Sequence, residues 1–215
     1  MRQITSILAL SLLACLVLGC ARSVEEVAYK VIIKDGNLEL REYPPYIVAE
    51  TEVDGNLEDA GDKAFSRLFA YISGENRSRE KIAMTAPVTQ NPSPQKIAMT
   101  APVEQQRTAG GWTVAFAMPK AYSLESLPVP QDPEVALRRV PARRMAAVRY
   151  SGTWREKRYR RYLRELEAWM AKTGLRMTSE PVWARYNPPF TPWFLRRNEI
   201  LIQVERESER SSACD

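Results

Sequence analysis

The sequence predicts an α+β domain in which two helices cover one curved antiparallel sheet. Short runs with a period of two alternate with two longer segments whose apolar residues follow a helical period. The order strands, helix, strands occurs twice, which indicates two pseudo-twofold halves of one domain. Each predicted helix has a single apolar face, so each must pack against a sheet.

The two helices have the clearest patterns. Residues 57–73 are followed by Gly74, and the second helix runs from a predicted cap at Thr153 to about residue 172, with Gly174 beyond it. One face of the first helix is apolar: positions i, i+3, i+4 and i+7 are Phe65, Leu68, Phe69 and Ile72. β-branched and alternating runs predict strands at 27–34, 38–42, 47–53, 112–118, 135–140, 145–150, 180–186 and 198–204.

An octapeptide, KIAMTAPV, occurs at residues 81–88 and again at residues 96–103. Its alternation of apolar residues is typical of a strand, and the seven residues between the copies are rich in turn formers. Two interpretations stay open. The copies form a hairpin of near-identical strands, or one copy lies in the sheet and the other is a tolerated loop insertion.

The N-terminal region is predicted to be a targeting segment. An apolar run at residues 7–18 follows Arg2, is too short to cross a bilayer as a helix, and is typical of a signal peptide. The next residues complete the run Val17-Leu18-Gly19-Cys20, which resembles the lipobox of bacterial lipoproteins and so implies acylation of Cys20; the alternative is an ordinary signal peptide. We expect a signal peptide at 1–19, a lipidated tether at 20–26, one folded domain at 27–204 and a disordered tail at 205–215.

Composition excludes several functions. The chain of 215 residues has a mild net charge of +5, three cysteines and no histidine. Without histidine, the Ser-His-Asp and Cys-His mechanisms, the usual zinc sites and the commonest axial ligand of haem iron are all excluded. Cys15 leaves with the signal peptide and Cys214 lies in the tail, so no intramolecular disulfide is expected.

The second helix also carries a basic face. Because an envelope lipoprotein meets little nucleic acid, we interpret this face as solvated, or as facing anionic lipid headgroups. It consists of Arg155, Lys157, Arg158, Arg160, Arg161 and Arg164.

Three motifs together resemble the SOUL/haem-binding protein family over residues 27–204. They are the octapeptide after a helix, the run Tyr186-Asn187-Pro188-Pro189, and the run Arg196-Arg197-Asn198-Glu199 that opens the last strand. The resemblance implies a distorted antiparallel β-barrel flanked by two helices, with haem or another tetrapyrrole between the first helix and the loop before the last strand. Some members are thought to ligate iron through histidine, which this chain lacks. Spacing from the first helix favours residues 81–88 as the copy in the family position.

A porphyrin is a flat apolar disc with two carboxylates on one edge, so its site needs apolar walls and cationic groups at the rim. The candidate walls are Phe65, Leu68, Phe69 and Ile72 on the helix and Phe190, Trp193 and Phe194 in the loop. The candidate propionate partners are Arg67, Arg196 and Arg197. The helix stripe is also typical of a plain core, and Arg197-Asn198-Glu199 of a structural network. Met84, Met99 and Tyr71 are candidate iron ligands, although no metal site built from the protein is expected.

The predicted function is therefore non-enzymatic binding of haem or a related tetrapyrrole by a lipid-anchored protein of the cell envelope. Ala21 after the cysteine favours the outer membrane, facing the periplasm. The expected partners are the porphyrin and, through the anchor, the membrane, with no nucleic acid. The alternative is an envelope scaffold or partner-binding module without a small ligand, which the absence of a pocket of a few hundred Å³ would favour. A tetrapyrrole enzyme is a third hypothesis, but the sequence offers no evident acid, base or nucleophile.

Overall fold

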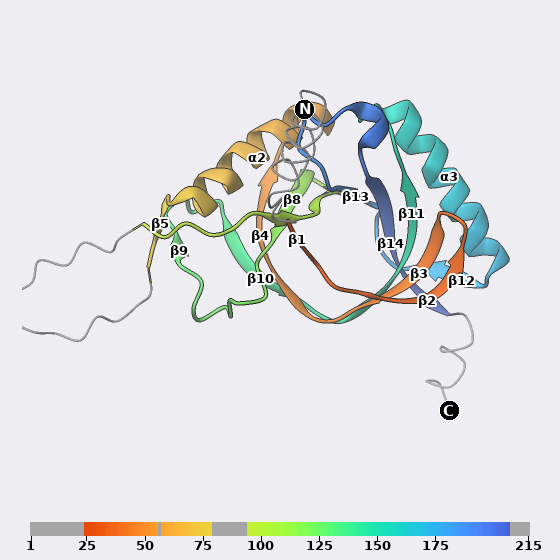
Figure 1. Cartoon of the computed structure of the whole chain (residues 1–215), viewed down its shortest axis with the longest axis horizontal. Coiled ribbons are helices and arrows are strands. Elements are labelled where there is room, and N and C mark those ends of the chain that lie inside the picture. The colour runs from red at the N-terminus through yellow and green to blue at the C-terminus, as the bar shows by residue number, and fades with distance from the viewer. Residues whose placement is uncertain (1–23, 56, 79–93, 207–215) are drawn as a thin grey trace, which may run out of the picture.

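The computed structural model describes residues 24–55, 57–78 and 94–206. Two helices, α2 (Leu57–Ser73) and α3 (Glu156–Lys172), arch over a large curved sheet (Figure 1). A short 3₁₀ helix, η1 (Trp193–Leu195), precedes the last strand. The predicted α+β class with two flanking helices is confirmed.

The main sheet is antiparallel and has ten strands. Nine follow the order β10-β4-β8-β7-β13-β14-β11-β3-β2, and β12 pairs with β14. Two small sheets, β1 with β6 and β5 with β9, lie outside it. The strands of the main sheet are β2 (Lys30–Asp35), β3 (Leu38–Tyr43), β4 (Tyr46–Val53), β7 (Val103–Thr108), β8 (Gly111–Ala117), β10 (Ala136–Val140), β11 (Arg143–Tyr150), β12 (Leu175–Met177), β13 (Val182–Arg185) and β14 (Asn198–Arg206). The short strands are β1 (Glu25–Glu26), β5 (Asn76–Arg77), β6 (Thr100–Ala101) and β9 (Val129–Pro130).

The strand order has pseudo-twofold character, as predicted. Strand β4 is followed by α2 and the hairpin β7–β8, and β8 pairs back onto β4. In the same way β11 is followed by α3 and then β13 and β14, and β14 pairs back onto β11. The strand that precedes each of these units pairs with the other unit: β3 pairs with β11, and β10 pairs with β4.

The sheet is curved but does not close into the barrel that the family resemblance implied. Its edges are β10 and β2, each paired on one side only. Strand β2 is largely exposed, carries Lys30 and Lys34, and has an irregular register between Val31 and Ile33. Charged side chains and a bulge are features that prevent an edge strand from pairing further, which explains why the sheet stays open.

Both helices cover the same face of the sheet, in separate places. Helix α2 packs on β4 and β8, where Leu68 and Ile72 join a buried cluster with Val114 and Phe116. Helix α3 packs on β11, β12 and β14 around a second buried cluster that includes Trp169. Neither helix of the described chain combines the length and apolar content needed to cross a bilayer.

Thr153 does not cap α3: the N-cap is Arg155, in extended backbone and without a side-chain capping bond. Residues 81–88 lie outside the described residues, so the octapeptide hairpin stays a prediction. The second copy, which spacing did not favour, reaches the main sheet with Val103, the first residue of β7. Its Ile97 is buried in the α2 cluster, and its residues 100–101 form β6 of a small separate sheet. Cys20 and the predicted signal peptide also lie outside the described residues.

Candidate functional site: a pocket between α2 and the loop before β14

A pocket of about 520 Å³ lies on the helix-covered face of the sheet, between α2 and the loop before β14. Its floor is formed by side chains of the central strands, namely Gln105 on β7, Val114 on β8 and Arg185 on β13. Helix α2 packs on β4 and β8, and α3 packs on β11, β12 and β14. Of the three floor strands, β8 is therefore at the border of the area that α2 covers, and β7 and β13 lie between the areas that the two helices cover. The pocket is thus the space left between the two helix-covered halves.

One wall is the face of α2 that looks toward the pocket. Phe65 and Phe69, one turn apart, stack with ring centroids 5.8 Å apart and planes 11° from parallel. Gly61 continues this face one turn earlier, and a Cβ there would lie 3.4 Å from the side-chain oxygen of Gln105. A glycine inside a helix costs about 1 kcal/mol relative to alanine. At this position it leaves room above the pocket floor.

The opposite wall comes from the loop after β13 and from the second octapeptide copy. The loop contributes Tyr186 to Phe190, including two consecutive prolines, and the octapeptide contributes Met99. The rim is apolar and open to solvent: Phe190 is 86% exposed, Val24 49%, Phe69 47% and Met99 37%. The wall residues therefore suit a ligand with a large apolar surface.

Arg185 supplies a cation at the pocket floor. Its guanidinium carbon lies 4.8 Å from the ring centroid of Trp154 and 4.6 Å from that of Trp183. Its Nη2 donates to Gln105 Oε1 at 3.3 Å. Two aromatic rings and a buried amide hold the guanidinium in one place, and such a group can pair with a carboxylate in planar, bidentate geometry.

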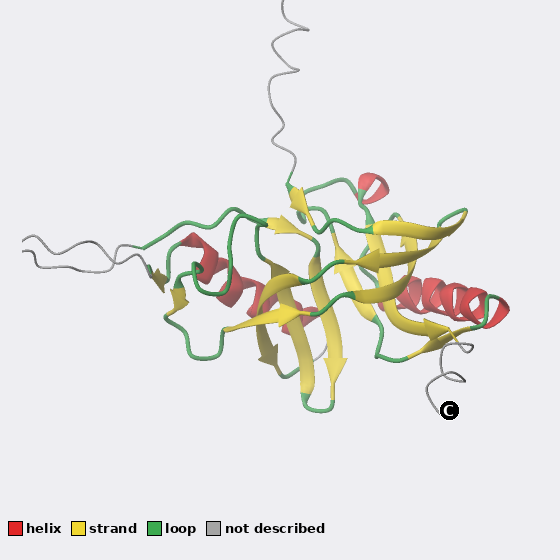
Figure 2. Cartoon of the chain, turned by 90° about the horizontal axis from the view of Figure 1, so that it is seen from below, coloured by secondary structure: helices red, strands yellow, loops and turns green. Residues whose placement is uncertain are grey.

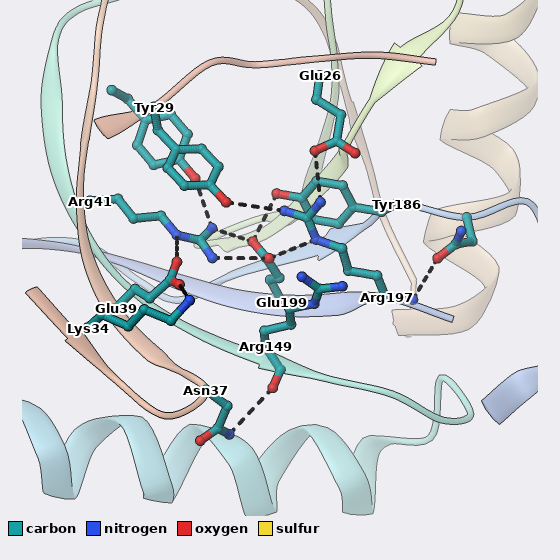
Figure 3. Close-up of polar contacts among 12 residues, drawn as sticks. Glu26, Tyr29, Lys34, Asn37, Glu39, Arg41, Arg149, Tyr186, Arg197 and Glu199 are labelled. Carbon is teal, nitrogen blue, oxygen red and sulfur yellow. Dashed lines mark hydrogen bonds and ion pairs between the residues drawn. The ribbon is translucent and has the colours of Figure 1, made fainter. Parts of the chain in front are cut away.

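A buried polar network fixes the base of the loop (Figure 3). Glu199, fully buried, accepts from Arg41 Nη2 at 3.1 Å, from Arg197 Nε at 2.9 Å and from the Tyr186 hydroxyl at 2.9 Å. Burial and the Glu199 carboxylate raise the pKa of Tyr186 well above its ordinary value, so its hydroxyl stays a donor at neutral pH. Burial disfavours the charge of Arg41, but its bonds to Glu199 outweigh this and raise its pKa.

This network also ties the start of the described chain to the loop. Arg197 Nη1 pairs with Glu26 at 2.8 Å, and its guanidinium lies 3.7 Å from the ring centroid of Tyr186. Arg196 donates to the carbonyls of Thr191, at 2.7 Å, and Pro189. Both arginines are thus engaged in holding the loop.

The predicted site residues separate into three groups. Phe65, Phe69 and Phe190 line the pocket. Leu68 and Ile72 are buried in the core cluster instead, and Arg67 points away to Thr51, Asp132 and Glu134. Trp193 and Phe194 are exposed on η1 and do not line the pocket, and neither do Arg196 and Arg197.

Of the candidate iron ligands, Met99 lines the pocket and offers a thioether to a haem iron. Tyr71 is buried and donates to the carbonyl of Pro128 at 2.9 Å, away from the pocket. Met84 lies outside the described residues. Among the described residues no group of three or more His, Cys, Asp or Glu side chains could hold a metal ion. The lining therefore fits a tetrapyrrole through apolar walls, Arg185 and, for iron, Met99.

The sequence matches the family model described as SOUL heme-binding protein over residues 24–203. The chain belongs to the SOUL family. Membership indicates haem or tetrapyrrole binding, and this family is not known for catalysis. No curated protein matches this SOUL-family chain.

Several solved structures share the fold. The isolated C-terminal domain of EcmrR matches with a TM-score of 0.52 at 12% identity, over 83% of this chain and 98% of that one. EcmrR in a DNA complex matches with a TM-score of 0.55 at 14% identity, over 79% of this chain; the match spans only 57% of EcmrR. A hydrolase from Listeria innocua matches with a TM-score of 0.51 at 12% identity, over 81% of this chain and 94% of that one. At such low identity the likeness shows the fold alone.

Proposed function

We propose that this SOUL-family protein binds haem or a related tetrapyrrole in the pocket between α2 and the loop before β14, and that it does so without catalysis. The observation that carries the proposal is the pocket itself. Its volume of about 520 Å³ lies within the range of small-molecule sites, and its lining is mostly apolar. It occupies the interval between helix and loop in which the family resemblance implies the ligand.

Each lining group has a task in this proposal. Phe65, Phe69 and Phe190 cover the faces of the macrocycle, and Arg185 pairs with a propionate carboxylate. Met99 is the lining residue that suits iron. Bound haem would supply a redox-active iron, while the protein supplies shape, charge and exclusion of water. Affinity without imidazole must come mainly from apolar burial and the carboxylate pair.

We also propose that the protein is held at the cell envelope by acyl chains on Cys20 and faces the periplasm from the outer membrane. The support is the lipobox-like run Val17-Leu18-Gly19-Cys20 after an apolar segment. Nucleic acid has no part in this proposal. The rival hypothesis, a scaffold without a small ligand, is weakened by the open pocket beside Phe65 and Phe69.

Titration with hemin tests the proposal. We expect a saturable Soret shift together with quenching of tryptophan emission, because Trp154 lines the pocket. Phe69→Ser should weaken hemin binding about tenfold or more, given the value of a buried aromatic surface. Trp193→Ala is the matched control, since Trp193 is exposed to a similar degree but lies off the pocket. If the wild type shows no Soret shift and no quenching, that result counts against haem binding.

A further inference from the structure

The loop before β14 exposes an aromatic surface of which the haem proposal uses only Phe190. We define this surface as Phe190, Trp193, Phe194 and Leu195, which are 86%, 56%, 58% and 64% exposed. No other large apolar side chain of the described residues is more than half exposed. Single exposed apolar residues are ordinary on protein surfaces, but four within six positions form a patch that marks an interaction site.

Hydrogen bonds within the loop hold this surface in place. Arg196 donates to the carbonyls of Thr191 and Pro189, and the backbone amide of Arg197 donates to the Asn187 side chain at 2.6 Å. The guanidinium of Arg196 also lies 4.4 Å from the ring centroid of Trp154. The aromatic side chains are therefore presented on a fixed support, so binding would order little further chain.

The start of the described chain lies beside this surface. Val24 and Phe190 line the same pocket, and Glu26 pairs with Arg197 at 2.8 Å. Figure 2 shows β1 and the short helix η1 at the same edge of the molecule. Cys20 precedes Val24 by four residues, which span at most about 14 Å when fully extended. Acyl chains on Cys20 would thus hold Val24, and the surface next to it, close to the bilayer.

The chemistry of the surface suits a lipid bilayer. Tryptophan favours the boundary between headgroups and acyl chains, and phenylalanine and leucine form the apolar faces that are buried there. Arg155 and Lys157, next to Trp154 in sequence, are exposed at the start of α3 and can meet anionic headgroups. From Cys20 onward the chain carries a net charge of +4, because Arg2 is the only charged residue before Cys20 and removing it lowers +5 by one. This is the sign that such headgroups attract.

We propose that the aromatic surface inserts into the headgroup region of the bilayer that carries the Cys20 anchor. The apolar rim of the pocket, which includes Phe190 and Val24, then opens at the lipid surface. An amphiphilic ligand dissolved in the bilayer can enter the pocket without crossing water. This inference rests on the lipid anchor of the proposed function, but not on haem being the ligand.

The test uses the full lipid-modified chain in vesicles of phosphatidylethanolamine and phosphatidylglycerol with brominated acyl chains, which quench nearby tryptophans. We expect the wild type to be quenched, and Trp193→Phe to lose most of that quenching. The double substitution Phe194→Ser/Leu195→Ser should reduce it by half or more. Met177→Ser is the control, because Met177 is 46% exposed on β12, which follows the far end of α3.

Two further measurements separate this inference from haem binding. Hemin affinity, measured in detergent, should be the same for the wild type and Phe194→Ser/Leu195→Ser, because neither residue lines the pocket. Equal quenching in the wild type and Trp193→Phe, or none in either, would overturn the bilayer contact whatever the hemin result. Mass spectrometry of the N-terminal peptide is decisive as well, because an unmodified Cys20 would refute the anchor and this inference together.

Discussion

Replacing Glu199 by alanine should destabilise the fold by about 3–5 kcal/mol, the usual cost of removing one partner of a buried ion pair. The carboxylate is 0% exposed and the Arg41 side chain 1% exposed. Without Glu199, the Arg41 charge keeps, among the residues that the structure describes, only Glu39 as a charged partner, at 2.8 Å. The hydroxyl of Tyr186 and the Nε of Arg197 lose an acceptor as well.

Urea unfolding followed by tryptophan fluorescence measures this effect. With a slope of about 2 kcal/mol per molar urea, a loss of about 4 kcal/mol lowers the midpoint by about 2 M. Glu156→Gln provides the control, because it removes an exposed pair on α3 in which both side chains are more than 60% exposed. Such pairs contribute about 0.5 kcal/mol or less.

A double substitution identifies the cause. Arg41→Met/Glu199→Leu removes both buried charges and should recover at least half of the stability lost by Glu199→Ala, since apolar replacements of a buried pair are often neutral. Because Glu199 also anchors the loop that lines the pocket, Glu199→Ala should weaken hemin binding too. The reasoning fails if Glu199→Ala and Glu156→Gln have the same urea midpoint.

Three other predictions concern the pocket and pH. Arg185→Gln should raise the hemin dissociation constant about tenfold, which corresponds to one charge-assisted hydrogen bond. Arg67→Gln should leave the dissociation constant unchanged, because the guanidinium of Arg67 points to Asp132. Met99→Leu should alter the Soret spectrum of the hemin complex but not the affinity for iron-free protoporphyrin, and an unchanged spectrum would exclude thioether ligation. Burial raises the pKa of five tyrosines above the ordinary value of 10, so the folded state keeps protons that the unfolded chain releases. Their contribution to stability is complete below about pH 10 and falls above it by up to about 1.4 kcal/mol per pH unit for each tyrosine. These tyrosines are Tyr43, Tyr46, Tyr150, Tyr159 and Tyr186. Phenolate absorbance should show that they ionise only as the protein unfolds at high pH.

Sequence patterns predicted the elements that bury one apolar face. Helix α2 begins and ends at the predicted residues, and the long strands lie within a few residues of their predicted bounds. Strand β7 was not among the predicted strands, because its sequence VEQQRT is polar. Gln105 on this strand is only 3% exposed, which no alternation of apolar residues could reveal. The missed strand forms part of the pocket floor, so the floor was missed with it.

The candidate residues show what helical periodicity can and cannot separate. The apolar stripe of α2 was predicted as one surface, but it divides: Phe65 and Phe69 turn toward the pocket, while Leu68 and Ile72 turn into the core. Arg185 was missed, although a signal existed. It follows Trp183 by two positions in a predicted strand, so both share one face, and an arginine on a face with a large apolar residue needs a partner or a ligand.

The partners of the other arginines could not be predicted, because they come from distant parts of the chain. Arg67 pairs with Asp132 and Glu134, which lie between β9 and β10. Arg41 pairs with Glu199, which is 158 positions away. Charge pairing across such separations depends on the strand order, and local patterns carry no information about it.

The pocket itself follows from the proportions of the fold. Adjacent strands lie about 4.8 Å apart, so the nine strands along the sheet path span about 38 Å. Two helices, each about 10 Å across, cover about half of this width. A central strip at the pseudo-twofold axis must therefore be covered by loops or left open, and the fold alone does not decide what binds there. The residues that line the pocket determine which ligand fits. In this chain Phe65, Phe69 and Phe190 favour an apolar ligand, and Arg185 favours one that carries a carboxylate.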